Sequence, residues 1–302
     1  MRALRAYKQI LKKKGWYVCC NEVRKRIFRL RWLRSLKVVE AAEEDKVFRC
    51  LKKYYKQQTT QSEVKENPYP NKIWICWLQG MENAPHIVKR CYLSIQKHSG
   101  SREIIVITEN NMSQYVNFPE YIKKRILKKQ ISPTHISDLI RISLLAEYGG
   151  IWLDSTCYLT DNIPDYVTNE PVFMFKSFLF SLHIKASNWF MAAQPNNSII
   201  CQTRDMLYEY WRREKFLKHY FIFHLSLSIV VDANNQNRLL WKKMPVFPNT
   251  NPHLLQFELF DEYNKERLEQ IKNLSFVHKL SYKFPLENFE KKNTFYDIIF
   301  NS

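Results

Sequence analysis

Short apolar runs alternate along the chain with longer segments in which apolar residues recur every three or four positions. The short runs predict buried β-strands, and the longer segments predict helices with one buried face. The predicted strands span residues 72–77, 103–108, 151–153, 158–164 and 171–175, and the predicted helices span 85–96, 115–130, 135–148, 199–213 and a segment that starts at 220. Strands that alternate with helices indicate an α/β domain.

The stretch from His135 to Thr156 carries most of the candidate chemistry. It predicts a helix, a turn at Gly149-Gly150, a short apolar strand, and an acidic residue where that strand ends. Asp138 and Arg141 are three positions apart and therefore share one face of the helix. The glycines suit a left-handed helix end and a close approach of two backbones. Ligands of open α/β sheets bind at the carboxyl ends of the strands, which makes Asp154 a candidate site residue.

The segments SDLIR and LLAEYGGIWLDST resemble the core motif of bacterial capsular polysaccharide synthesis glycosyltransferases. These proteins are related to glycosyltransferase family 32 and, more distantly, to the glucosylating domains of large clostridial toxins. The resemblance extends from about Asn67 to Phe284. It implies a GT-A fold, an α/β architecture that binds a nucleotide-sugar, with helical additions at the C-terminal end. The chain departs from the family pattern in one place, because it has Asp154-Ser155-Thr156 where most relatives have Asp-x-Asp.

The resemblance also implies a divalent metal, Mn²⁺ or Mg²⁺, bound to the diphosphate of a UDP-sugar. Such a metal neutralises the charge on the leaving diphosphate and takes oxygen ligands. Asp154 would supply one ligand, whereas Thr156 offers only a neutral hydroxyl, so a weaker site or one completed by distant ligands is expected. The late segment VHKLSYK resembles a family signature, in which His278 would complete the metal shell and Lys279 and Lys283 would hold phosphate oxygens. A basic, solvated strand is the alternative for this segment.

Asp138, Arg141 and Asp154 are the predicted catalytic residues. In relatives, the positions of Asp138 and Arg141 hydrogen-bond the hydroxyls of the donor sugar, and the planar fork of Arg141 also suits phosphate. The alternative for this pair is a structural ion pair within the helix. The complete motif favours the functional interpretation.

Further donor contacts are predicted at the ends of the first two strands. In relatives, the first strand ends with an aromatic residue that stacks on uracil, so Trp74 is the candidate, with Trp77 as its neighbour. Cys76 lies two positions further along the same predicted strand and is included in the donor site. Asn110 follows the second strand and is a candidate nucleotide contact, although asparagine in a turn often has only a conformational role.

Two residues are assigned to the acceptor side. Trp189 lies in a segment that resembles the acceptor-facing part of the family, and it would form a platform for a sugar ring. His224 resembles a recurrent family histidine. For both residues, packing in the core is the alternative.

The positive charge is concentrated near the N-terminus. The net charge is +18 for 302 residues, yet residues 1–60 alone hold 18 Lys and Arg against 5 Asp and Glu. Phe28, Trp32, Leu36 and Val39 recur at helical spacing among these basic residues, which is typical of a helix on an anionic membrane surface. A solvated helix packed on the catalytic domain is the alternative. The predicted organisation is a basic helical extension, residues 1–66, and a GT-A domain, residues 67–302.

Several classes of protein are not indicated. The seven cysteines include no C-x-x-C pair, so neither a zinc site nor a disulfide framework is expected, and a reduced, cytoplasmic setting fits best. No apolar run has the length of a membrane span, and no signal peptide is expected. No recognised nucleic-acid module is present, so nucleic acid is not an expected partner.

These observations predict a glycosyltransferase that adds a hexose, glucose or galactose, from a UDP-sugar to a lipid-linked capsular or lipopolysaccharide oligosaccharide. The family resemblance implies retention of configuration, and the lack of a second acidic motif favours a front-face route over a covalent intermediate. Peripheral attachment to the inner membrane face would bring the enzyme to its acceptor. A toxin-like protein glycosyltransferase and a degenerate sugar-binding scaffold are the alternatives.

Overall fold

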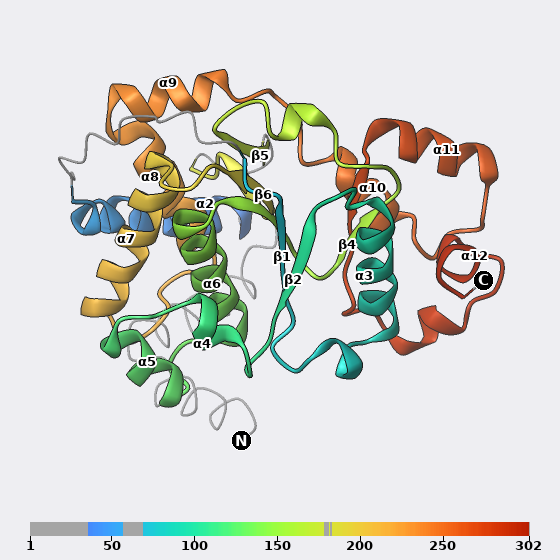
Figure 1. Ribbon diagram of the computed structural model, residues 1–302, viewed down its shortest axis with the longest axis horizontal. Coiled ribbons are helices and arrows are strands. Elements are labelled where there is room, and N and C mark those ends of the chain that lie inside the picture. Colours follow the sequence, from blue (N-terminus) through green and yellow to red (C-terminus); the bar gives the residue numbers. More distant parts are fainter. Residues whose placement is uncertain (1–35, 57–68, 178–180, 182, 302) are drawn as a thin grey trace.

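The computed structural model describes residues 36–56, 69–177, 181 and 183–301 (Figure 1). At its centre is a five-stranded mixed sheet with the strand order β2-β1-β3-β6-β5. Its strands are β1 (Lys72–Cys76), β2 (Glu103–Ile107), β3 (Gly150–Leu153), β5 (Val172–Lys176) and β6 (Ala186–Ala193). β1 pairs in parallel with β2 and β3, whereas β6 pairs antiparallel with β3 and β5. The predicted α/β class is therefore confirmed, and the mixed sheet between helices fits a Rossmann-like GT-A fold.

The central strands are buried on both faces. Successive side chains of a strand point to opposite faces, so Trp74 and Trp152 pack into one hydrophobic cluster while Ile73, Ile75 and Ile151 pack into another. Apolar residues on both faces explain why these strands are continuous apolar runs in the sequence and show no polar alternation.

Helices cover both faces of the sheet and form a three-layer arrangement. Figure 1 shows α2, α6, α7 and α8 on one side and α3, α10, α11 and α12 on the other. The helices are α2 (Leu36–Leu51), α3 (His86–His98), α4 (Met112–Tyr115), α5 (Glu120–Leu127), α6 (Pro133–Glu147), α7 (Ser198–Arg213), α8 (Ile222–Ala233), α9 (Asn235–Lys243), α10 (Leu254–Phe257), α11 (Lys265–Leu274) and α12 (Phe295–Phe300). Short 3-10 helices are η2 (Lys52–Tyr54), η3 (Met81–Asn83), η4 (Asp165–Val167), η5 (Asn251–His253) and η6 (Leu286–Glu290).

The central helix α6 begins two residues before the predicted start and ends at the predicted glycine turn. Ser132 caps the helix by accepting a hydrogen bond from the backbone N–H of His135, and Pro133 occupies the first turn, where its missing N–H costs nothing. At the other end, Gly149 has φ +64° and Gly150 has φ +94°. A Cβ at Gly149 would lie 2.6 Å from the backbone nitrogen of Pro195. The predicted left-handed turn and close backbone approach are both confirmed.

Two predicted elements differ from the structure. The helix expected at 115–130 is shorter and forms α5 alone, while Tyr115 ends the separate helix α4; Pro119 immediately precedes α5 and cannot continue a helix from the preceding segment. The strand expected at 158–164 is shorter, and it belongs to a separate two-stranded sheet. In that sheet β4 (Cys157–Leu159) pairs antiparallel with β7 (Val277–Lys279). This pairing brings a late segment of the chain next to the loop that follows β3.

Part of the predicted N-terminal extension packs with the domain. Val47, Leu51 and Tyr54 are almost fully buried in the cluster on the α6 side of the sheet. The predicted domain boundary after residue 66 lies outside the described residues, as do Phe28, Trp32 and most of the basic residues of the extension. No helix in the described part of the chain combines the length and hydrophobicity that crossing a membrane requires.

Candidate active site at the carboxyl ends of β1 and β3

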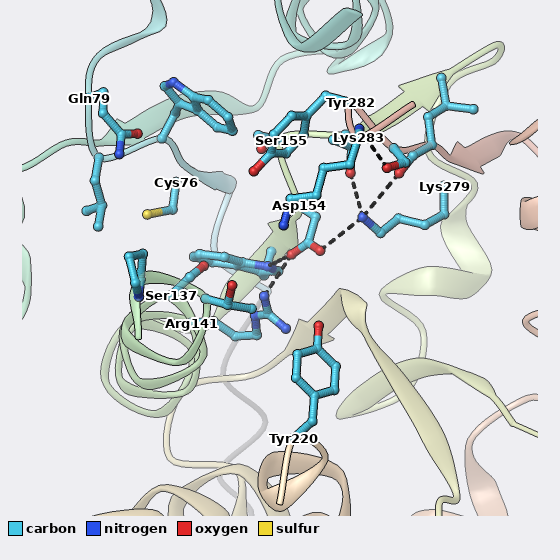
Figure 2. A pocket seen from close by; sticks show the side chains of 18 residues that line it. Cys76, Gln79, Ser137, Arg141, Asp154, Ser155, Tyr220, Lys279, Tyr282 and Lys283 are labelled. Carbon is cyan, nitrogen blue, oxygen red and sulfur yellow. Dashed lines mark hydrogen bonds and ion pairs between the residues drawn. The ribbon is translucent and has the colours of Figure 1, made fainter. Parts of the chain in front are cut away.

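A cavity of about 360 Å³ opens at the carboxyl ends of β1 and β3. Its walls come from residues 76–79 after β1, the first turns of α6, residues 154–156 after β3, residues 279–283 at the end of β7, and Tyr220 before α8. Figure 2 shows Arg141, Asp154 and Lys279 close together in its interior. The structure thus brings six predicted site residues into one cavity: Cys76, Arg141, Asp154, Thr156, Lys279 and Lys283.

Asp154 is held in a fixed position at the end of β3. Its backbone N–H donates to the carbonyl oxygen of Trp189 on β6 at 2.8 Å, which ties the loop to the sheet. Its Oδ1 accepts hydrogen bonds from Arg141 Nη2 at 2.7 Å and from Trp152 Nε1 at 3.0 Å. Its Oδ2 lies 3.3 Å from Lys279 Nζ. Both carboxylate oxygens therefore face positive charge within the cavity.

Arg141 is a buried cation between two carboxylates. Only 4% of its side chain is exposed, and Nη1 lies 3.2 Å from Asp138 Oδ1 while Nη2 contacts Asp154. The guanidinium also lies over the Trp152 ring, 4.9 Å from its centroid. These contacts fix the plane of the guanidinium, which suits the directional binding of phosphate or sugar oxygens.

Asp138 lies behind Arg141 and is not one of the cavity-lining residues. Its carboxylate interacts with Arg141, with the ring of His135 at 3.1 Å, and with Asn188 Nδ2 at 2.9 Å. Burial would raise the pKa of Asp138, but the charge of Arg141 and the hydrogen bond from His135 outweigh burial and hold the pKa below its ordinary value. The predicted direct contact of Asp138 with the donor sugar is therefore corrected, because its oxygens are directed at protein groups. It positions Arg141.

Two lysines from the end of β7 add to the positive charge of the cavity. Lys279 Nζ donates to Thr156 Oγ1 and approaches Asp154. Lys283 also lines the cavity, and within the described residues no carboxylate pairs with it. The cavity walls therefore carry three cationic side chains and one carboxylate, which favours an anionic ligand.

The residues present do not fit the predicted metal site. His278 neighbours Lys279 on β7 and therefore points the other way: it is fully buried, and its Nε2 lies 3.1 Å from Thr160 Oγ1. Burial lowers the pKa of His278 to about 4. Asp154 and Thr156 already contact the Lys279 ammonium. No group of three or more His, Cys, Asp or Glu side chains in the described part of the chain is arranged to hold a metal ion. The assignment of His278 as a metal ligand is thus wrong.

Two predicted donor contacts lie outside the cavity. Trp74 is 1% exposed, and its Nε1 donates to the carbonyl oxygen of Gly149 at 2.8 Å, so this ring cannot stack on a base. Asn110 is exposed in the turn after β2 and is not one of the lining residues. The neighbouring Asn111 has the conformational role, because its side chain bonds the backbone of Val106 and Thr108.

The two predicted acceptor-side residues do not line the cavity either. Trp189 is 5% exposed and stacks on Phe175 with the ring centroids 5.0 Å apart, so it is a core residue. His224 packs edge-on against Phe221 and Phe223. Burial lowers the pKa of His224 to about 4, so its ring is neutral near pH 7. For Trp189 the core alternative is correct, whereas His224 is only partly buried and its assignment to the acceptor side stays a prediction.

Besides the buried Trp152, three aromatic residues line the cavity, and none of them was assigned to the site from the sequence: Trp77, Tyr220 and Tyr282. Trp77 is half-buried one position after β1, and its ring meets that of Tyr282 edge-on at 5.4 Å. Tyr220 is 65% exposed, and its hydroxyl points into the cavity toward Arg141 and Asp154 (Figure 2). Trp77 could have been assigned to the site from the sequence, because it ends a predicted strand. Tyr220 could not, because it precedes an apolar helix and no local pattern marks it as a site residue.

Comparisons with known proteins point to transferases. The O-glycosyltransferase braB of Annulohypoxylon truncatum is 25% identical in an alignment of 176 residues that covers 51% of this chain and 42% of that protein. The O-glycosyltransferase PaGT of Phomopsis amygdali is 24% identical in an alignment of 199 residues that covers 57% of this chain and 49% of that protein. The chain therefore spans less than half the length of these two curated relatives.

Among solved structures, the PaToxG glycosyltransferase is similar with a TM-score of 0.40 and 14% identity, covering 87% of this chain and 95% of that one. A transferase mutant has a TM-score of 0.34 and 11% identity, covering 64% of this chain and 99% of that one. The family model described as capsular polysaccharide synthesis protein matches residues 30–299. Because this match spans most of the sequence and includes every residue of the cavity, the chain belongs to the capsular polysaccharide synthesis protein family.

Proposed function

We propose that this protein is a glycosyltransferase that transfers a hexose from a UDP-sugar to a saccharide acceptor. The observation that carries the proposal is the convergence of Arg141, Lys279 and Lys283 with Asp154 in one cavity at the carboxyl ends of parallel strands. Three cations around one carboxylate suit a diphosphate linked to a neutral sugar. The family and the O-glycosyltransferase relatives support the same class of reaction.

In this proposal each wall of the cavity holds one part of the donor. Trp77 and Tyr282 form an aromatic corner for the base, which replaces the role first assigned to Trp74. Lys279 and Lys283 bind the diphosphate as flexible point charges. Arg141 and Asp154 contact the sugar and the adjoining oxygens, and Asp138 keeps the guanidinium in place from behind.

We propose a front-face transfer that retains the configuration of the sugar. The bond between the anomeric carbon and the diphosphate oxygen breaks, and the electron pair stays on that oxygen. The acceptor hydroxyl attacks from the same face and gives its proton to the departing diphosphate. Among the described residues that line the cavity, Asp154 is the single carboxylate, and its contacts with Arg141, Trp152 and Lys279 fix it as a positioning group. Orientation and charge stabilisation then supply the catalysis.

The proposed acceptor is a lipid-linked capsular or lipopolysaccharide oligosaccharide at the cytoplasmic membrane face. The family description and the strong positive charge of residues 1–56 support this assignment. The exposed ring of Tyr220 at the cavity wall offers a surface for a sugar ring on the acceptor side. Full-length protein should float with phosphatidylglycerol vesicles at low salt, and protein that lacks residues 1–35 but keeps α2 should not. Equal flotation of both proteins would reject the membrane role of the extension.

Donor hydrolysis tests the central proposal without knowledge of the acceptor. The protein is incubated with a panel of UDP-sugars, and release of free sugar and UDP is followed by chromatography. We expect slow hydrolysis of one donor and its loss in Asp154→Ala, with circular dichroism as a control for folding. If no donor is hydrolysed and calorimetry detects no UDP binding, the proposed function is wrong.

A further inference from the structure

The ammonium of Lys279 occupies the place that the sequence assigns to a metal ion. It lies 3.3 Å from Asp154 Oδ2, donates to Thr156 Oγ1, and has the carbonyl oxygen of Leu280 at 3.5 Å. Asp154 and Thr156 are the two oxygen ligands that the Asp-Ser-Thr motif would give to a divalent cation. Figure 2 shows the side chain of Lys279 extending toward the carboxylate of Asp154. Two of the ammonium's three donors are directed at Asp154 and Thr156, and the third has only the distant carbonyl oxygen of Leu280, so it is available to a ligand in the cavity.

The surroundings of Asp154 oppose a second cation at the same place. Its Oδ1 already accepts from Arg141 and Trp152, so Oδ2 is the oxygen that remains, and Lys279 contacts it. A divalent ion on Oδ2 would have to displace the ammonium and would then lie close to the fixed guanidinium of Arg141. Repulsion between two unit charges 4 Å apart is about 4 kcal/mol in partly buried surroundings, and a doubly charged ion experiences more.

The third predicted ligand is also out of reach. β7 pairs with β4 in a register that sets Tyr158 opposite His278 and Cys157 opposite Lys279. Because neighbouring side chains of a strand alternate, this register directs Lys279 into the cavity and His278 into the core, where it contacts Thr160. The pairing of β7 with β4 therefore turns His278 away from the cavity and places Lys279 in it.

We propose that Lys279 replaces the divalent metal in this enzyme, so that nucleotide-sugar binding and transfer proceed without a metal ion. The inference rests on the proposed function. The ammonium donates hydrogen bonds to the diphosphate oxygens and stabilises the negative charge that grows on them as the bond to the anomeric carbon breaks. Asp154 and Thr156 keep the ammonium in place for this role.

Calorimetric titration with UDP separates this inference from the proposed function. Full-length protein is titrated after treatment with EDTA, and again with excess Mn²⁺ or Mg²⁺. We expect dissociation constants within about twofold of each other in the three conditions. Binding that needs metal, or is at least tenfold tighter with it, would overturn the inference and leave the proposed function standing. Absence of UDP binding in all conditions would reject both.

A matched pair of variants identifies the residue responsible. Lys279→Met removes the ammonium and keeps a long side chain, and the metal-free affinity for UDP should fall roughly 10- to 100-fold, as for loss of a charge-assisted hydrogen bond. Lys123→Met makes the same change at an exposed lysine of α5 and should leave the affinity unchanged. Equal affinities of the two variants would overturn the inference. If Lys279→Met does not fold by circular dichroism, the titrations of the wild-type protein still decide.

Direct binding of Mn²⁺ gives a readout that is independent of nucleotide. Electron paramagnetic resonance of free Mn²⁺, added to EDTA-treated and desalted wild-type protein, should show no stoichiometric loss of signal. Binding of one Mn²⁺ per protein that is abolished by Asp154→Ala would show that a metal displaces Lys279, and the inference would then be wrong.

Discussion

Replacing Asp138 by asparagine tests whether its carboxylate holds Arg141 in position at the active site. The side chain of Asp138 is 10% exposed, and its carboxylate interacts with Arg141, His135 and Asn188 at 2.9–3.2 Å. Asparagine keeps the shape and some hydrogen bonds but loses the charge. Hydrogen bonds to a charged group are worth about 1 kcal/mol more than neutral ones. Removing the only partner of a buried charge costs more, but Arg141 keeps Asp154 as a partner, so this larger loss of stability is not expected here.

We therefore expect Asp138→Asn to lower the free energy of unfolding by about 2–3 kcal/mol at pH 7. For a chain of this size, this corresponds to a melting temperature lower by about 4–6 °C. The control is Asp232→Asn, which removes an exposed carboxylate paired with Lys185 and should cost less than about 1 kcal/mol. Both variants are measured by urea unfolding and by thermal melting. A loss below about 0.5 kcal/mol in Asp138→Asn would refute the positioning role.

The pH dependence of the same difference follows from the lowered pKa of Asp138. A carboxyl group with a lower pKa in the folded than in the unfolded state stabilises the fold above the unfolded pKa of about 4, and this stabilisation is lost as the pH falls through the folded pKa. The difference between wild type and Asp138→Asn should thus be constant from pH 7 to pH 5.5 and shrink below about pH 4. A difference that grows on acidification would contradict the argument.

Three further predictions follow from the structure. Gly149→Ala should cost about 2–4 kcal/mol, because its new Cβ would lie 2.6 Å from backbone, whereas Gly100→Ala, with a similar φ but its nearest atom at 3.8 Å, should cost about 1 kcal/mol in the same urea unfolding assay. Trp77→Ala should weaken UDP binding roughly tenfold by calorimetry. Trp74→Phe should lower the free energy of unfolding, because it loses the buried hydrogen bond to Gly149, and should leave the affinity for UDP unchanged. The reverse result would restore Trp74 as the base-stacking residue. Burial raises the pKa of Cys76 to about 12, so iodoacetamide at pH 8 should alkylate it at least about 100-fold more slowly than in urea, as followed by mass spectrometry, and a rapid reaction would contradict this burial.

The layout around the central motif could be predicted because its signals are local. The apolar period predicts the central helix, the two glycines predict its end, and the strand-end rule places Asp154 at the ligand edge. Each of these signals depends on neighbours within a few residues. The α/β class could be predicted because strand and helix patterns alternate along the whole chain.

The roles of individual aromatic residues could not be predicted in the same way. In a strand buried on both faces, every position is apolar, so the sequence does not show which side chains point toward a site. The choice of Trp74 over Trp77 therefore rested on the family resemblance, and only the paired sheet shows that Trp74 lies in the core and Trp77 on the cavity wall. Trp189 was assigned wrongly for the same reason. Tyr220 reaches the cavity through the packing of α8, which is a long-range contact without a local pattern.

The register of β7 shows how one strand position changes the chemistry of a site. The segment offers both His278, a good metal ligand, and Lys279, a good phosphate ligand, and a shift of one residue exchanges the faces to which they point. The observed pairing with β4 puts the histidine in the core and the lysine beside Asp154. The missing second aspartate of the motif and this register both disfavour a divalent metal, because the ammonium of Lys279 already neutralises the single carboxylate of the site. A chain with the aspartate at position 156 would hold two carboxylates around Lys279, and a divalent cation would then have two strong ligands to compete for.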